Sequence, residues 1–211
     1  MSDKNIWNKL KSGDKTAFEY IYNTYFEILF QYGRKFTNDE STVEDCIQNL
    51  FIELWNKRES ISQTNAIKPY LFTALKRKII RAITKIRKST DNEIKDHYFD
   101  VEISIDEIII SNEIDQINKD RLTEAFEQLS DRQKEILYLR YHANLEYDEI
   151  VEIMDMNYQS ARNLVSRAIS KLSKIWMLAF IIWTLNLYHH KLFSFSMIQS
   201  EYKLLFKVFP L

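Results

Sequence analysis

Apolar residues in the first half of the chain recur at intervals of three or four positions, which is the spacing of one face of an α-helix. This spacing runs through residues 18–32 and again through residues 43–55. A third run spans residues 66–83, and Pro69 falls early enough in it to lie in a first helical turn. The pattern predicts a bundle of amphipathic helices over roughly the first ninety residues.

The second half of the chain has shorter apolar runs with clear helix-start signals. Residues 122–129 predict one short amphipathic helix that stops at Ser130. Ser130 and Gln133 have the spacing of a capping box, which predicts that a new helix begins there. Residues 147–154 predict a compact helix, followed by a break and a longer helix over residues 158–172.

The break between the last two helices predicts a helix-turn-helix. We expect Asp155 or Asn157 to adopt the left-handed backbone conformation that glycine often supplies at such a turn. Two helices joined by a short turn, of which the second is basic, have the geometry of a DNA-reading unit. The packed face of the second helix is predicted to consist of Ala161, Leu164, Val165, Ala168 and Leu172.

The opposite face of the 158–172 helix carries side chains that can bond duplex DNA. Arginine and asparagine can bond purine edges, whereas lysine and serine can bond phosphates. The residues predicted on or beside this face are Tyr158, Gln159, Ser160, Arg162, Asn163, Ser166, Arg167 and Lys171. The alternative is a basic helix face that contacts solvent and no DNA.

The formal net charge of −1 hides an uneven distribution of charge along the chain. Residues 76–88 contain no acidic side chain, and a second acid-free basic stretch spans residues 156–174. Residues 90–120 between them are strongly acidic. The sequence therefore predicts two helical modules, each ending in a basic element, that are joined by an acidic linker.

The first basic stretch follows two aromatic residues, Tyr70 and Phe72, on the same predicted helix. Its basic residues are Lys76, Arg77, Lys78, Arg81, Lys85, Arg87 and Lys88. Exposed aromatic rings beside positive charge suit melted DNA, because freed bases stack on the rings while the phosphates meet the charge. The alternative for Tyr70 and Phe72 is burial in the core of the bundle.

Composition excludes several classes of fold and chemistry. Two glycines and two prolines in 211 residues exclude an all-β fold and the glycine-rich phosphate loops. One cysteine and four histidines without ligand spacing predict no internal disulfide and no metal site, and we expect neither a cofactor nor catalytic residues. The N-terminus carries no export signal, so we place the protein in the cytoplasm.

The 43–55 helix carries polar residues that suit a protein partner better than catalysis. Asp45, Gln48, Glu53 and Trp55 lie on it without a nearby histidine, metal partner or nucleophile, so acid–base chemistry is not indicated. The residues themselves leave two interpretations, a partner-binding face and a hydrated helix surface.

Taken in order, three segments resemble an extracytoplasmic-function sigma factor of the bacterial sigma-70 family. They read VEDCIQNLFIELWNKRESI, IKPYLFTALKRKIIRAITKIRK and, beyond the acidic linker, LTEAFEQLSDRQKEILYLRYHANLEYDEIVEIMDMNYQSARNLVSRAISKLSK. Members of this group keep the second and fourth conserved regions of the family. This agrees with the two modules inferred above.

The resemblance implies an all-α fold with two helical domains. These are a sigma region 2 bundle at residues 1–89 and a region 4 helix-turn-helix at residues 119–174, joined by an acidic linker at residues 90–118. An apolar helical extension follows at residues 175–211. The implied function is to bind core RNA polymerase, at its β′ clamp helices and β flap, and to direct promoter-specific transcription initiation by recognising and melting promoter DNA.

The resemblance also assigns roles to residues. Asp45, Gln48, Phe51 and Trp55 match the part of region 2 that docks on the β′ clamp helices. Residues 69–88 match the helix that opens and reads the promoter −10 element, and residues 158–174 match the helix that reads the −35 element. Arg77 stands where many relatives have an asparagine that helps to capture a flipped base, so their −10 preference is not carried over.

The tail beyond Lys174 is unusually apolar, beginning IWMLAFIIWTLNLYHH. A membrane span needs about twenty apolar residues, and this run is too short unless it continues through Lys191. A helix that packs on the two modules, or that binds an anti-sigma factor, explains the same apolarity. A tail that covered the 158–174 helix would be autoinhibitory, and truncation after Lys174 would then raise promoter binding.

Two other functions agree with the residues taken without the resemblance. A stand-alone helix-turn-helix regulator would bind its DNA site without polymerase. A helical adaptor, attached to a membrane through the tail, would have no DNA target.

Overall fold

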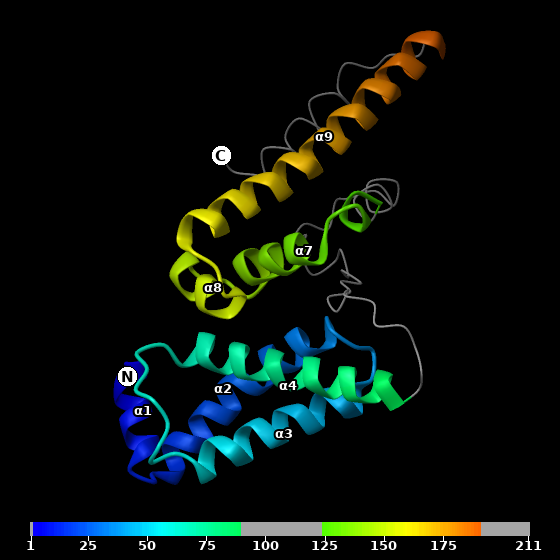
Figure 1. The fold of residues 1–211 in the computed structure, drawn as a ribbon. Coiled ribbons are helices and arrows are strands. Elements are labelled where there is room, and N and C mark those ends of the chain that lie inside the picture. Colours follow the sequence, from blue (N-terminus) through cyan, green and yellow to red (C-terminus); the bar gives the residue numbers. More distant parts are fainter. Residues whose placement is uncertain (1, 90–123, 191–211) are drawn as a thin grey trace.

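The computed structural model describes residues 2–89 and 124–190, and at residues 87–89 and 175–190 it describes the backbone (Figure 1). Regular structure within these ranges is helical, as the sequence predicts. The elements are α1 (Asp3–Lys11), α2 (Lys15–Arg34), α3 (Glu40–Asn56), α4 (Ile67–Ser89), α7 (Asp131–Leu137), the π-helix η1 (Tyr138–His142), α8 (Tyr147–Met154) and α9 (Tyr158–His190). The predicted acidic linker, residues 90–118, lies outside the described residues.

Helices α1 to α4 form an N-terminal bundle, and α7, η1, α8 and α9 form a C-terminal unit that faces α4 (Figure 1). In the bundle, α3 packs against α2 and α4, so each amphipathic run predicted from the sequence contributes one buried face. Pro69 lies in the first turn of α4, which confirms its predicted place. The packing of the bundle therefore fixes the positions of the exposed faces of α3 and α4 relative to each other.

The sequence pattern did not indicate α1, whose short apolar face fills the end of the bundle. Ile6, Trp7 and Leu10 are buried, and the Trp7 side chain has no exposed surface. The indole Nε1 of Trp7 donates a hydrogen bond to the Ser62 carbonyl oxygen at 3.0 Å, and the Trp7 ring meets the Tyr70 ring edge-on at a centroid distance of 4.9 Å. Trp7 thus ties α1 to the segment that precedes α4.

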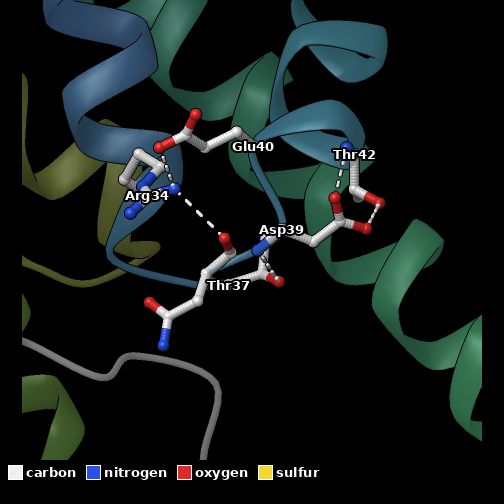
Figure 2. Close-up of polar contacts among 6 residues, drawn as sticks. Arg34, Thr37, Asp39, Glu40 and Thr42 are labelled. Carbon is white, nitrogen blue, oxygen red and sulfur yellow. Dashed lines mark hydrogen bonds and ion pairs between the residues drawn. The ribbon is translucent and has the colours of Figure 1, made fainter.

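The turn between α2 and α3 is fixed by side-chain bonds (Figure 2). Asp39 is the N-cap of α3 and accepts hydrogen bonds from the Thr42 amide at 3.3 Å and from the Thr42 hydroxyl at 2.6 Å. The hydroxyl bond lowers the pKa of the Asp39 carboxyl from its ordinary value. Arg34 at the end of α2 pairs with Glu40 at 2.6 Å, which joins the two helices across the turn.

Gly33 lies where α2 passes closest to α3 and α4. An added Cβ would stand 2.5 Å from Val43 Cγ1 and 3.0 Å from Ile79 Cδ1. We therefore expect Gly33→Ala to lower the free energy of unfolding by about 1–3 kcal/mol, because the core must shift to admit one methyl group. Urea denaturation measures the loss. Adding Val43→Ala removes the closest atom and should restore part of the stability; a Gly33→Ala protein as stable as the parent would contradict this packing.

The C-terminal unit begins as predicted. Residues 124–127 are helical, and Ser130 and Gln133 form the expected capping box at the start of α7. Asp155, at the end of α8, has a φ of 49° and provides the left-handed turn expected at this residue or Asn157. Asn144, two residues after the end of η1, also has a positive φ, of 50°. The sequence analysis anticipated neither η1 nor the left-handed Asn144.

Helix α9 is much longer than the 158–172 helix predicted from the sequence. It continues without interruption to His190 and so includes the first part of the apolar tail. Because a continuous helix cannot fold back on itself, residues 175–190 do not cover the 158–174 face, which corrects the autoinhibitory hypothesis for this part of the tail. Residues 191–211 lie outside the described residues. Among residues 2–89 and 124–190, no helix has both the length and the apolar character needed to cross a bilayer.

Candidate nucleic-acid interface

Helix α9 presents its predicted polar face to solvent and buries its predicted apolar face. Ala161, Val165, Ala168 and Leu172 are buried, and Leu164 is partly buried. The eight residues predicted on the polar face are all exposed: Tyr158, Gln159, Ser160, Arg162, Asn163, Ser166, Arg167 and Lys171. The helical register deduced from the sequence is therefore correct throughout this segment.

The start of α9 is held in position by local bonds. The Asn157 side chain accepts a hydrogen bond from the Ser160 amide at 2.7 Å, which is an N-cap interaction. The Tyr158 ring meets the Tyr147 ring of α8 edge-on at 5.6 Å. Helix α8 packs against α9 and buries Ile150 and Met154. These contacts fix the first turn of α9 on α8.

The cationic side chains of α9 differ in how far they are free to bind a ligand. Within the described residues, neither Arg162 nor Arg167 has a hydrogen bond or ion pair that engages its guanidinium group. The Lys171 ammonium donates a hydrogen bond to the Gln128 carbonyl, so it is fastened to the segment before α7. Gln159 Nε2 donates to Asn163 Oδ1 at 3.1 Å, which orients both amide side chains.

Among the residues that the structure describes, the basic side chains of α4 divide into a set without an ion-pair partner and a paired set. Arg77, Arg81 and Lys85 are exposed and follow one another at intervals of four residues, which places three positive charges on one stripe with a repeat of about 6 Å. We call these three residues the α4 stripe. Lys78 is paired with Glu53 of α3 at 2.5 Å, and this bond lowers the pKa of the Glu53 carboxyl.

Two further predicted residues of α4 do not join the stripe. Lys76 pairs with Glu135 of the C-terminal unit at 2.6 Å. The side chain of Arg87 lies outside the described residues. The aromatic residues before the stripe belong to the core, which decides between the two interpretations of the sequence: Phe72 is fully buried, and Tyr70 is partly buried against Trp7.

The exposed face of α3 carries two of the four residues that the resemblance assigned to polymerase. Asp45 and Gln48 are exposed, whereas Trp55 is half-buried beneath the Arg58 guanidinium at 4.6 Å. Phe51 corrects the prediction, because it is buried against the Tyr22 ring at 4.9 Å and cannot lie on the surface. Phe51 lies on the side of α3 that faces the core.

Ile52 is the residue of this face that the sequence analysis missed. Its side chain is 56% exposed, which is high for an isoleucine on a well-packed helix. Ile52 follows Gln48 by four positions and Asp45 by seven, so the three share one face of α3. This spacing is the sequence feature from which Ile52 could have been identified. We call these three residues the α3 face.

No group of three or more metal-ligating side chains occurs in the described parts of the chain. Cys46 is buried, and burial raises the pKa of its thiol, so it is a packing residue of α3.

The family models for Sigma-70 region 2 and Sigma-70 region 4 match residues 21–89 and 119–172, in that order. Together they cover more than half of the chain. The chain is an extracytoplasmic-function sigma factor of the sigma-70 family. It is similar to the ECF RNA polymerase sigma factor SigM of Bacillus subtilis (strain 168), with 25% identity over 74% of this chain and 93% of that protein. It is also similar to the RNA polymerase sigma factor YlaC of the same organism, with 23% identity over 76% of this chain and 92% of that protein.

Solved structures share the fold of this sigma factor. CnrH, in complex with the cytosolic domain of CnrY, matches with a TM-score of 0.57 at 17% identity, over 83% of this chain and 97% of that chain. RpoE of Bartonella quintana, in complex with the anti-sigma factor NepR, matches with a TM-score of 0.52 at 17% identity, over 76% of this chain and 96% of that chain. As a sigma factor, the protein binds core RNA polymerase and directs transcription initiation at promoters.

Proposed function

We propose a division of labour among the three surfaces of this sigma factor. The exposed face of α9 reads the −35 element, the α4 stripe holds the melted −10 strand, and the α3 face docks on the β′ clamp helices of RNA polymerase. The domain division is residues 1–89, 90–118, 119–174 and 175–211. The family-model matches, of which one ends at residue 89 and the other begins at residue 119, support the bounds of the linker. The protein acts in the cytoplasm as a binding factor without catalysis of its own.

The observation that carries the −35 assignment is the free pair of guanidinium groups on α9. Arg162 and Arg167 project from an exposed face whose opposite side is buried, and no described residue occupies them. Arginine bonds guanine bidentately in the major groove and also bonds phosphate. A helix mounted in this way can lie in the groove without disturbing its own packing.

The α4 stripe supports binding of a single strand through charge. With Phe72 buried and Tyr70 packed on Trp7, the start of α4 offers no exposed ring on which bases could stack. Arg77, Arg81 and Lys85 therefore act on the phosphates. Removal of each cation should reduce the salt dependence of single-strand binding by about 0.7 in the slope of log K against log salt.

The test of the proposed function is reconstitution with core bacterial RNA polymerase. Purified protein is captured on the polymerase and the mixture transcribes a promoter library that core enzyme ignores. New start sites identify both promoter elements and support the division of labour. DNA binding without polymerase would favour a stand-alone regulator, and absence of both activities would favour an adaptor; either result contradicts the proposal.

The α3 face gives a sharper prediction. Ile52→Ala should weaken binding to core polymerase by about tenfold, because an exposed apolar side chain that becomes buried in an interface contributes more than 1 kcal/mol. Asp45→Ala combined with Gln48→Ala should weaken it as well. Affinity is measured by fluorescence anisotropy of labelled protein. Tyr20→Ala, which truncates an exposed apolar residue on α2, is the control, and an equal loss in this variant would show that the effect is not specific to α3.

A further inference from the structure

Glu53 of α3 lies at the boundary with α4, where three cationic side chains act on its carboxylate. The Lys78 ammonium of α4 lies 2.5 Å from Glu53 Oε1, and the Lys57 ammonium lies 3.8 Å from Glu53 Oε2. Arg81 of α4 acts on the same carboxylate through its charge and makes no ion pair among the described residues. The bond from Lys78 and the charges of Lys57 and Arg81 lower the pKa of the Glu53 carboxyl. We call Lys57, Lys78 and Arg81 the cation triad.

The cation triad carries more positive charge than Glu53 can neutralise. Each member has one positive charge, and within the described part of the chain Glu53 is the carboxylate that pairs with Lys57 and Lys78, whereas Arg81 pairs with none. The remaining positive charge attracts a further anion, because the potentials of neighbouring like charges add. The side chains of Lys57 and Glu53 are 67% and 53% exposed, so an anion from solvent can reach them.

The geometry of the two ion pairs suits a phosphodiester. Lys78 and Lys57 approach different oxygens of one carboxylate, so their ammonium groups are spaced to hold two oxygens of a single anion. A phosphodiester likewise offers charged oxygens that accept bonds from cationic side chains. Ion pairs between exposed side chains contribute little to stability, so a phosphate can replace the carboxylate at a small cost.

The cation triad continues the surface that we propose holds the melted −10 strand. Arg81 belongs to both the α4 stripe and the cation triad, and Lys78 directly follows Arg77 of the stripe. Helices α3 and α4 pack side by side (Figure 1), and Lys57 lies at the end of α3. Lys57 therefore extends the positive surface from α4 onto α3, and a strand that follows the stripe can turn onto α3 at Arg81.

We propose that the cation triad binds a phosphodiester of the melted strand, and that Glu53 occupies this site in the free protein as a competing anion. The strand must displace the carboxylate and break two ion pairs, which weakens non-specific binding. A strand that is already held by the rest of the α4 stripe reaches the site at a high effective concentration and displaces Glu53. This inference rests on the proposed function for the presence of the strand at α4, and it adds Lys57 and Glu53 to that surface.

The experiment measures binding of fluorescent oligothymidylate to the full chain at several salt concentrations. Glu53→Gln keeps the size of the side chain but removes the charge that occupies the site. Affinity should rise by about fivefold at the lowest salt, and the slope of log K against log salt should steepen by about 0.7, because one more phosphate is neutralised without competition. Glu44→Gln is the matched control and should change neither value, because Glu44 is exposed on the same helix and makes no ion pair in the described ranges.

Lys57→Ala tests the cation that is new to the DNA-binding surface. In the Glu53→Gln background it should remove most of the gain in affinity and reduce the salt slope by about 0.7. In the parent the same substitution should have a smaller effect, because Glu53 competes for the site there. Lys15→Ala, which removes an exposed lysine of α2, should leave binding unchanged in both backgrounds. Urea denaturation checks that each variant keeps the fold, which the apolar core of the bundle maintains.

Three outcomes would overturn the inference. An equal gain in Glu53→Gln and Glu44→Gln would show only a long-range effect of charge. A loss of affinity in Glu53→Gln would mean that Glu53 positions Lys78 for DNA and does not compete with it. If Lys57→Ala weakens binding to core polymerase and leaves oligothymidylate binding unchanged, the cation triad belongs to the polymerase interface.

Arg77→Ala separates this inference from the proposed function, because Arg77 belongs to the α4 stripe and lies outside the cation triad. If Arg77→Ala lowers the salt slope while the changes at Glu53 and Lys57 leave it unaltered, the stripe binds the strand and the cation triad does not. If the changes at Glu53 and Lys57 alter the slope while Arg77→Ala does not, the cation triad stands and the stripe fails. Absence of oligothymidylate binding in every variant would overturn both.

Discussion

Trp7→Ala should lower the free energy of unfolding of the N-terminal bundle by about 3–5 kcal/mol, the largest loss of stability expected from a single substitution here. The Trp7 side chain has no exposed surface, so alanine would leave a cavity between α1 and the start of α4. The hydrogen bond from its indole to the Ser62 carbonyl at 3.0 Å would also be lost. Urea denaturation followed by far-ultraviolet circular dichroism measures the change.

The controls for Trp7 separate packing from hydrogen bonding. Trp7→Phe retains an aromatic ring against Tyr70 and should cost less than Trp7→Ala, because part of the cavity stays filled. Trp55→Ala removes the same residue type from a half-buried position and should also cost less. A loss of stability equal to that of Trp55→Ala would contradict a central role for Trp7 in the core.

Arg162→Ala combined with Arg167→Ala should weaken binding of the holoenzyme to its promoter by at least about thirtyfold. Each arginine that contacts a base contributes about 1–3 kcal/mol, and the two side chains are exposed and free within the described part of the chain. The protein should keep its stability, since neither guanidinium supports the fold. Anisotropy of a labelled promoter duplex at one fixed salt concentration measures the affinity.

A charge-matched control is available in the N-terminal bundle. Lys4→Ala combined with Lys15→Ala removes two positive charges from exposed positions on α1 and α2. This variant should bind the promoter as the parent does, because long-range attraction between exposed charges is weak at physiological salt. An equal loss of affinity in both double variants would mean that α9 contributes general charge and no reading of bases. Loss of discrimination at single −35 positions would support base contacts.

Local signals explain why much of the C-terminal unit was predictable. The capping box at Ser130, the left-handed residue at Asp155 and the two faces of α9 each depend on residues within a few positions of one another. The same spacing rule places Phe51 in the apolar run of residues 43–55, since it follows Ile47 by four positions, and the structure buries it there. The family resemblance assigned it to the surface instead, and the helical phase was the better guide.

Long-range pairs explain what the sequence could not reveal. Glu135 and Lys76 are 59 positions apart, and Glu135 and Tyr32 are 103 apart. In the sequence, Glu135 is one charged residue among several at the start of α7, and nothing local indicates that it is buried. Likewise, Lys76 and Lys78 belong to one basic run, yet each is neutralised by a carboxylate from a different helix.

The unbroken course of α9 connects its far end mechanically to the face that we propose reads the −35 element. From Leu172, the last buried residue described on it, to His190 the helix extends by about 27 Å at 1.5 Å per residue. A rigid rod transmits torque as well as force. A partner that bound the end of α9 and turned it would therefore rotate the exposed face near Tyr158 by the same angle. One residue inserted between positions 175 and 190 would rotate the tip by about 100° and leave the reading face unchanged. The rotational position of the helix tip relative to Arg162 and Arg167 is therefore fixed by the number of residues that separate them.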